Sequence, residues 1–228
     1  AAEKTVRLVR DTIKLEKQAA KSEIKLVPGP EGHELRIGVI TVPAFYSDFE
    51  AARRALKENR RNSRDVRRLL KDLNGKIDGL VLDLRENGGG SLQEAVDLTG
   101  LFIGDGPVVQ VRNASGRVEV EQDSEGNRLY SGPLAVLVDH ASASASEIFA
   151  GAIQDYGRGV VIGDPTFGKG TVQTLVDLNR LTRAKDPQGQ LKLTIAKFYR
   201  VNGSSTQNRG VRPDIDIPSV VDSEDIGE

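Results

Sequence analysis

The sequence predicts an α/β fold with a mixed, largely buried sheet and crossover helices, because apolar strands alternate with helical segments along the chain. Compact apolar runs at 78–85, 134–138 and 159–163 are typical of strands buried on both faces. The first two runs lead through glycine-rich or serine-rich segments into helical patterns at 92–102 and 141–157. This order of strand, loop and helix is the first half of a crossover connection between parallel strands.

The remaining elements follow the same two periodicities. A helix is expected where apolar residues recur at helical spacing from Val66 to Leu73, with Ser63 as its cap and Gly75 after its end. A turn at 113–116 joins the two strands of a predicted β-hairpin. Further strands are predicted near residue 5, near residue 24, at 34–42, at 171–178 and at 191–201.

Composition excludes several classes of function. The 32 Lys and Arg residues and 33 Asp and Glu residues give a net charge of −1, without the basic surplus that nucleic-acid binding requires. Cysteine is absent, which excludes thiol catalysis, cysteine zinc sites and disulfides. No apolar run approaches the roughly 20 residues of a membrane helix. Methionine is also absent and no signal peptide precedes Ala1, so we interpret the sequence as a processed product or an excised piece.

The stretch GDPTFGKGT at 163–171 has the spacing of a phosphate-binding loop. Such a loop needs a Ser or Thr directly after its lysine and a helix N-terminus behind it. Here Gly170 follows Lys169, the next residues are strand-like, and Pro165 removes one backbone donor. Nucleotide binding is therefore disfavoured, and a turn lysine that reaches solvent is the simpler alternative.

The serines of ASASAS at 141–146 include a candidate nucleophile, but a histidine partner is hard to find. The sequence holds only His33 and His140. His33 lies in a turn, and His140 precedes Ser144 by four residues, which rarely allows a base to face its nucleophile. Ser144 also has capping-box spacing to Glu147, so the residues alone leave a structural role open.

Three loops are expected to meet at the carboxyl edge of the sheet. The loop after 78–85 brings a glycine-rich backbone, the loop after 134–138 brings serines, and the loop after 159–163 brings Lys169. Backbone donors, a nucleophile and a base are the parts of an acyl-transfer site. A lysine serves as a base only when neutral, and burial away from carboxylates favours that form.

Four motifs carry a resemblance to a known family: LDLRENGGGSLQEA, SASASEIFAGAIQDYGRG, GDPTFGKGTVQ and FYRVNGSSTQNRGVRPDI. In this order and spacing they resemble the tail-specific or C-terminal-processing serine peptidases, particularly their periplasmic bacterial branch. The resemblance implies a ClpP/crotonase-like peptidase core at 36–217. Residues 1–35 would then be an entry segment where a PDZ domain adjoins, and residues 218–228 an acidic tail.

The resemblance also implies roles for individual residues. Ser144 would be the nucleophile, Lys169 the general base and Gln173 the residue that orients the lysine amine. The backbone N–H groups of Gly89 and Ala145 would form the oxyanion hole.

Two structural expectations accompany these roles. In a straight strand Lys169 and Gln173 would be about 13 Å apart, so we expect a kink or bulge near Gly170. Asp83 and Arg85 are expected to support the glycine-rich loop and not to take part in the chemistry.

The implied function is that of a Ser-Lys endopeptidase that cleaves unfolded or C-terminally tagged proteins without a cofactor or metal. The implied partners are unstructured C-terminal tails of substrates, a lipoprotein adaptor and further copies in an oligomer, in the bacterial periplasm. A PDZ domain, which recognises peptide C-termini by strand addition, is not recognisable, and neither are the helical extensions of the periplasmic branch. A catalytically silent scaffold and an α/β nucleotide binder remain as alternatives.

Overall fold

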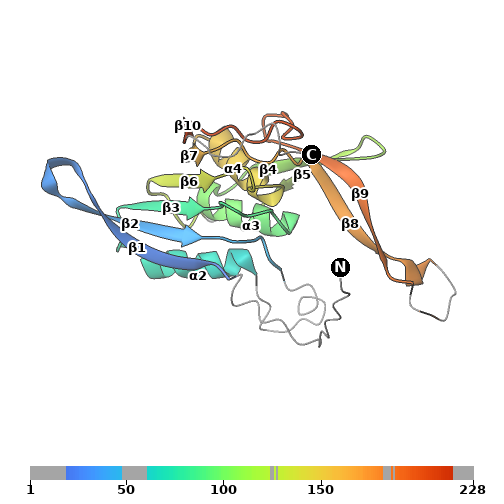
Figure 1. Cartoon of the computed structure of the whole chain (residues 1–228), viewed down its shortest axis with the longest axis horizontal. Coiled ribbons are helices and arrows are strands. Elements are labelled where there is room, and N and C mark those ends of the chain that lie inside the picture. The colour runs from blue at the N-terminus through green and yellow to red at the C-terminus, as the bar shows by residue number, and fades with distance from the viewer. Residues whose placement is uncertain are drawn as a thin grey trace, which may run out of the picture.

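The computed structural model describes residues 19–47, 61–123, 126, 128–181, 186 and 188–217. Within these residues the strands form two sheets, one of six strands and one of four. Figure 1 shows the β1–β2 hairpin projecting at one end of the molecule and the β8–β9 hairpin at the other. The strand predicted near residue 5 and the acidic tail at 218–228 lie outside the described residues.

The six-stranded sheet has the order β1-β2-β3-β6-β7-β10. β1 is antiparallel to β2, and every other neighbouring pair is parallel, so the predicted mixed sheet is confirmed. Its central strands are apolar because helices and loops cover them. The strands are β1 (Lys21–Pro28), β2 (Glu34–Thr41), β3 (Gly79–Asp83), β6 (Leu134–Val138), β7 (Val160–Gly163) and β10 (Ile215–Asp216).

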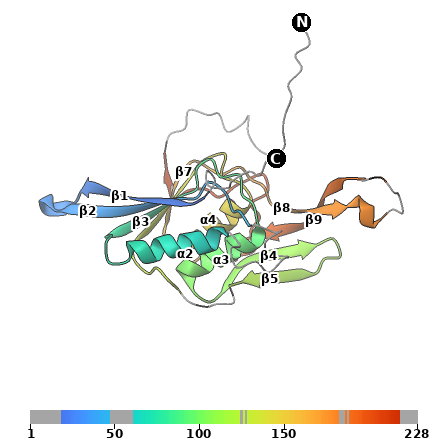
Figure 2. The same ribbon diagram turned by 90° about the horizontal axis from the view of Figure 1, so that it is seen from below.

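Three α-helices, α2 (Asn62–Leu73), α3 (Leu92–Ile103) and α4 (Ala145–Asp155), pack against one another in chain order. Figure 2 shows them together on one side of the six-stranded sheet. The helical spacing from Val66 to Leu73 is confirmed, because the apolar residues of this run are buried. The expected cap is wrong: α2 begins at Asn62, and the Ser63 N–H and hydroxyl both donate to Glu94 of α3 at 2.9 Å.

The core between the helices fixes the position of α4. Phe102 of α3 and Phe149 of α4 are fully buried and meet edge to face with ring centroids 5.6 Å apart. Such aromatic pairs contribute about 0.5–1.5 kcal/mol beyond the burial of their area. The N-terminus of α4 is thereby held beside the carboxyl ends of the parallel strands. Among the described residues no helix is both long and apolar enough to cross a membrane.

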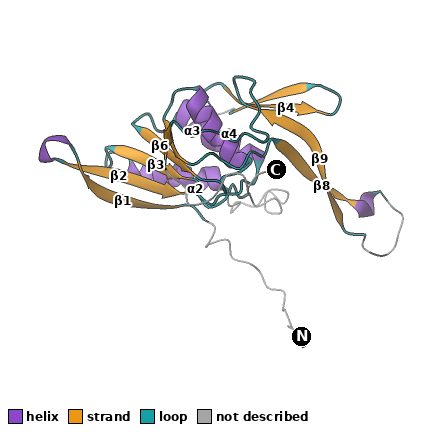
Figure 3. Ribbon diagram, turned by 45° about the horizontal axis from the view of Figure 1, so that its top comes forward, coloured by secondary structure: helices purple, strands orange, loops and turns teal. Residues whose placement is uncertain are grey.

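The second sheet is entirely antiparallel, with the order β5-β4-β9-β8. The predicted hairpin is confirmed as β4 (Pro107–Asn113) and β5 (Val118–Gln122). It pairs through β4 with β9 (Gln190–Tyr199), which in turn pairs with β8 (Thr171–Asp177). Figure 3 shows β8 and β9 extending from the body of the molecule as a two-stranded arm. The first residue of this arm, Thr171, is the last residue of the GDPTFGKGT stretch.

Candidate active site

Ser144 lies at the turn from β6 into α4 in a backbone conformation that non-glycine residues rarely adopt. Its φ is 57° and its ψ is −109°. Backbone strain of this kind is found mainly at functional sites, where the surrounding structure holds it in place. The Ser144 residue is partly exposed, whereas Ser142 and Ser146 are fully buried.

The two flanking serines have structural partners. The Ser142 hydroxyl donates to the carbonyl of Leu84, and the Ser146 hydroxyl donates to the carbonyl of Asn87, each at 2.8 Å. Both bonds tie the serine loop to the loop that follows β3. Ser144 is the least buried of the three serines and forms a capping box with Glu147 at the N-terminus of α4.

The glycine-rich loop after β3 packs directly on Ser144. A Cβ atom on Gly89 would lie 2.7 Å from the carbonyl oxygen of Ala143 and 2.9 Å from the Ser144 Cβ, and the φ of Gly89 is 98°. Only glycine fits this close approach. The same hypothetical atom would lie 3.0 Å from the Ala145 nitrogen, so the predicted oxyanion donors sit on adjacent segments.

Asn87 holds this loop in place, although the sequence analysis did not identify it. Its side-chain amide donates to the carbonyl of Val42 at 2.7 Å, and its amide oxygen accepts the Gly89 N–H at 2.9 Å. The Gly89 N–H is therefore engaged in this conformation, and an oxyanion would have to replace the Asn87 oxygen. The only sequence signal was the position of Asn87 directly before three glycines.

Glu147 joins the serine loop to the lysine loop. This fully buried carboxylate accepts hydrogen bonds from the Thr166 hydroxyl and the Gly168 N–H on Oε1, both at 2.8 Å. On Oε2 it accepts the N–H groups of Ser144 at 2.7 Å and Lys169 at 2.9 Å. Burial raises the pKa of the Glu147 carboxyl above its usual range, and these hydrogen bonds oppose the rise.

Capping-box spacing was the only sign of Glu147 in the sequence, and it accounts for one of these four bonds. The Glu147 carboxylate does accept from the Ser144 N–H, as a capping box requires. The contacts to Thr166, Gly168 and Lys169 cross about twenty residues and depend on the tertiary fold. Position 147 is therefore part of the site.

Lys169 is partly buried and points toward Gln173. Its Nζ donates to the Gln173 Oε1 at 3.4 Å, and the Gln173 Nε2 donates to the Thr194 hydroxyl at 3.5 Å. Both distances are long for hydrogen bonds. No hydrogen bond links the Lys169 amine to the Ser144 hydroxyl in the part of the chain that the structure describes. The predicted residues thus lie in one site, but the Lys169 amine and the Ser144 hydroxyl are not hydrogen-bonded to each other.

A bulge lies close to the position expected near Gly170, but its extra residue, Ile195, is on β9 and not between Lys169 and Gln173. β8 starts at Thr171, and its register with β9 shifts between Val172 and Gln173, which marks a bulge. Gly168 supplies a φ of 93° just before the lysine. Because a strand and not a helix follows the motif, the phosphate-loop alternative is wrong.

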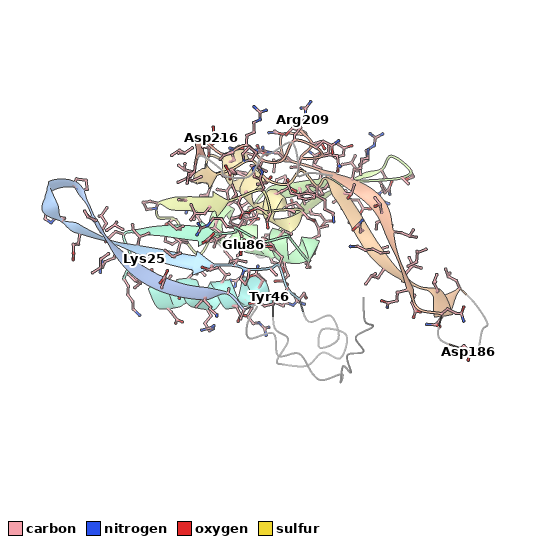
Figure 4. The ribbon with its side chains drawn as sticks, viewed as in Figure 1. Lys25, Tyr46, Glu86, Asp186, Arg209 and Asp216 are labelled. Atoms are coloured by element: carbon pink, nitrogen blue, oxygen red, sulfur yellow. The ribbon has the colours of Figure 1, made fainter. Side chains whose placement is uncertain are left out.

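Charged residues at the end of β3 support the glycine-rich loop as expected. The Arg85 guanidinium donates to both Asp83 carboxylate oxygens, at 2.9 and 2.7 Å. The next N–H, that of Glu86, donates to the Asp139 carboxylate at 2.9 Å. Figure 4 shows Glu86 beyond the end of β3, near the middle of the molecule. His140 is buried and makes no hydrogen bond to Ser144 among the described residues.

Comparison with known proteins accounts for this arrangement. The model of peptidase family S41 matches residues 36–217, which is most of the chain. The chain belongs to peptidase family S41. The peptidase interpretation of the sequence is thereby supported. In this S41 core no group of three or more His, Cys, Asp or Glu side chains could hold a metal ion, as far as the described residues extend.

Two curated relatives and one solved structure illustrate the similarity. The chain is 48% identical over 225 residues to the tail-specific protease of Haemophilus influenzae, covering 98% of this chain and 30% of that protein. It is 38% identical to the carboxy-terminal-processing protease of Bartonella bacilliformis, covering 92% of this chain and 43% of that protein. The photosystem II D1 C-terminal processing protease is 28% identical with a TM-score of 0.67, covering 87% of this chain and 48% of that one. The chain thus spans less than half the length of each of these proteins.

Proposed function

We propose that this S41 core is a serine endopeptidase in which Ser144 is the nucleophile, Lys169 the general base and Gln173 the residue that orients the lysine amine. One observation carries the proposal: a single oxygen of Glu147 accepts the N–H groups of both Ser144 and Lys169. The backbone nitrogens of Ser144 and Lys169 therefore cannot be farther apart than the combined length of their two hydrogen bonds to this oxygen. Their side chains are therefore within reach of each other.

The proposed reaction begins when the neutral Lys169 amine takes the proton of the Ser144 hydroxyl. The Ser144 Oγ attacks the peptide carbonyl, and the oxyanion accepts hydrogen bonds from the N–H groups of Ala145 and Gly89. The Lys169 ammonium then gives its proton to the leaving amine. Water, deprotonated by Lys169, attacks the acyl-enzyme ester, and the proton returns to Ser144 as the acid product leaves.

In the described conformation the proposed catalytic groups are not yet in contact, and we propose that substrate binding brings them together. The Lys169 amine contacts Gln173 and not Ser144, and the Gly89 N–H is held by Asn87. Catalytic hydrogen bonds are often long in free enzymes and shorten in the substrate complex. The same open contact favours a second candidate, a silent core that binds substrates as a scaffold.

The substrate class and setting are proposed from the relatives. Two of them are a tail-specific protease and a carboxy-terminal-processing protease, so this core is proposed to cleave unfolded or C-terminally tagged proteins. The setting is the bacterial periplasm, a lipoprotein adaptor presents substrates, and the protein works as an oligomer.

The test compares the chain with its Ser144→Ala and Lys169→Ala variants. Hydrolysis of a fluorescently labelled unfolded protein should fall by a factor of 1,000 or more in each variant, because nucleophile and base act as one unit. A fluorophosphonate probe should label the parent chain and not Ser144→Ala. Equal rates in all three proteins would overturn the mechanism. Peptide binding without hydrolysis or labelling would establish the scaffold.

A further inference from the structure

A groove of about 390 Å³ lies on the four-stranded sheet, where the β4–β5 turn meets β9. Its charged walls are Arg112 of β4 and Lys197 of β9, and Ile195 and Tyr199 add apolar surface. The groove contains neither Ser144 nor Lys169. It is therefore distinct from the site described above.

The two cations of the groove are placed against each other. Arg112 and Lys197 are directly opposite in the register of β4 and β9, and both are exposed. Like charges at directly opposite positions destabilise a sheet. No carboxylate in the described part of the chain pairs with either one. In contrast, the nearby Arg117 pairs with Glu119 at 3.3 Å.

Apolar side chains flank these cations on the same face of the sheet. Val118 is directly opposite Arg112, and Val120 and Tyr199 are both opposite Gln110. The two valines are 48% and 51% exposed. Because side chains alternate between faces, this face is the one opposite to the buried Phe198. The surface thus complements a carboxylate with apolar neighbours.

The groove is connected to the proposed catalytic residues through β9. Thr194, which lines the groove, accepts the hydrogen bond from Gln173. Lys197 is directly opposite Thr171, which follows Lys169 by two residues. A peptide that lies in the groove can therefore continue toward the lysine.

We propose that this groove is an exosite for a carboxylate of an extended peptide, held between Arg112 and Lys197 at a distance from the bond that is cleaved. The carboxylate is either the free C-terminus of the peptide or an acidic side chain. That the bound peptide is a substrate rests on the proposed peptidase function. Binding of the carboxylate itself does not.

The experiment measures peptide binding by fluorescence polarisation in the Ser144→Ala background, where cleavage cannot interfere. Three labelled apolar peptides are compared: one with a free C-terminus, one amidated with an internal glutamate, and one amidated and neutral. Arg112→Gln and Lys197→Gln are each expected to weaken binding of a carboxylate peptide about tenfold, since a hydrogen bond to a charged group is lost. The matched control is Lys192→Gln, an exposed lysine of β9 outside the groove.

The peptide that responds identifies the source of the carboxylate. Charge reversal by Arg112→Glu and Lys197→Glu together should transfer the preference to a peptide with an internal lysine. Equal affinity for all three peptides, equal loss in Lys192→Gln, or no binding at all would overturn the exosite. If the parent chain binds carboxylate peptides but does not cleave, the exosite proposal stands and the peptidase proposal is refuted. If the chain cleaves and Arg112→Gln leaves KM unchanged, the peptidase proposal stands and the exosite proposal is refuted.

Discussion

At the scale of single residues, three serines within five positions have two different roles. Ser142 and Ser146 are buried, and their hydroxyls donate hydrogen bonds to backbone carbonyls of the neighbouring loop. Ser144 between them is partly exposed and has a positive φ. One repeated residue type therefore supplies the support of the loop and, in the proposed mechanism, its nucleophile.

Replacing Ser146 with alanine tests this division. The variant loses a buried hydrogen bond to Asn87, so we expect it to be about 1 kcal/mol less stable while cleavage stays within a few-fold of the parent. Ser144→Ala should show the opposite, with lost cleavage and nearly unchanged stability. Urea unfolding and hydrolysis of an unfolded protein measure the two effects. If Ser146→Ala lost cleavage at full stability, the assignment of Ser144 as the nucleophile would be wrong.

Glu147→Gln tests the link between the two loops. The NH2 group of glutamine cannot accept hydrogen bonds, so two of the four donors around Glu147 lose their partner, which costs on the order of 3 kcal/mol. We expect lower stability together with a lower kcat and slower fluorophosphonate labelling, since Ser144 and Lys169 are no longer held together.

The matched control for this variant is Glu94→Gln. Glu94 is also buried, and burial raises the pKa of its carboxyl, but its hydrogen bonds go to Ser63 on α2. This control should lose stability and keep kcat at temperatures where it is folded. An equal fall in kcat in both variants would show that Glu147 acts through stability alone.

The proposed catalytic residues were easier to identify in the sequence than the residues that hold them. The motifs identified Ser144, Lys169 and Gln173, which lie on one site in the fold. Asn87 and most contacts of Glu147 were missed because their partners are distant in the chain. No local pattern reports a partner that only tertiary folding brings near.

At the scale of elements, the bulge in the β8–β9 arm lies beside Gln173. Val172 is opposite Ala196, whereas Gln173 is opposite Thr194, so Ile195 is the extra residue of β9. A bulge bends and twists the strand that carries the extra residue. The bulge therefore sets how β9 presents Thr194 to the Gln173 amide.

Deleting Ile195 should remove the bulge, and with it the local bend and twist of β9 that place Thr194 against Gln173. We expect at least a tenfold loss of kcat with a cooperative thermal transition retained, because the deletion lies at a strand position that already lacks a partner. The substitution Ile195→Ala keeps the extra residue and should keep kcat. Full activity after the deletion would show that Gln173 does not orient the base.

Most elements were predictable because their apolar periodicity is local. The strands at 134–138 and 171–178 and the hairpin around 113–116 were found close to their observed positions. The two-residue strand β10 was missed, since it is too short to show a period. The division into two sheets was also missed, because pairing of β4 with β9 joins segments that are far apart in the sequence.

At the scale of the whole molecule, one arginine joins α4 to the second sheet. Arg200 follows β9 and donates to the Asp155 carboxylate at 2.6 Å, the Gln154 side chain at 2.9 Å and the Gly151 carbonyl at 3.2 Å. The side chains of Arg200 and Asp155 are only 14% and 7% exposed. This buried ion pair thus connects α4, which begins directly after Ser144, with the sheet that carries Gln173.

Arg200→Met should destabilise the whole molecule. It leaves the buried Asp155 carboxylate without its partner, which costs about 3–5 kcal/mol. The comparison variant Arg117→Met breaks the exposed pair with Glu119 and should cost about 0–1 kcal/mol. Urea unfolding measures both changes. Equal, small losses would mean that α4 and the second sheet are held together by apolar packing.

Glu147 binds two loops that are far apart in the sequence, so the proposed site can form only late in the synthesis of the chain. The ribosome releases Ser144 first, then Lys169, and later Thr194 beside Gln173. Until β9 has paired with β8, the nucleophile exists without an oriented base. Incomplete chains are therefore expected not to cleave one another, because the proposed activity begins only when almost the entire core has been made.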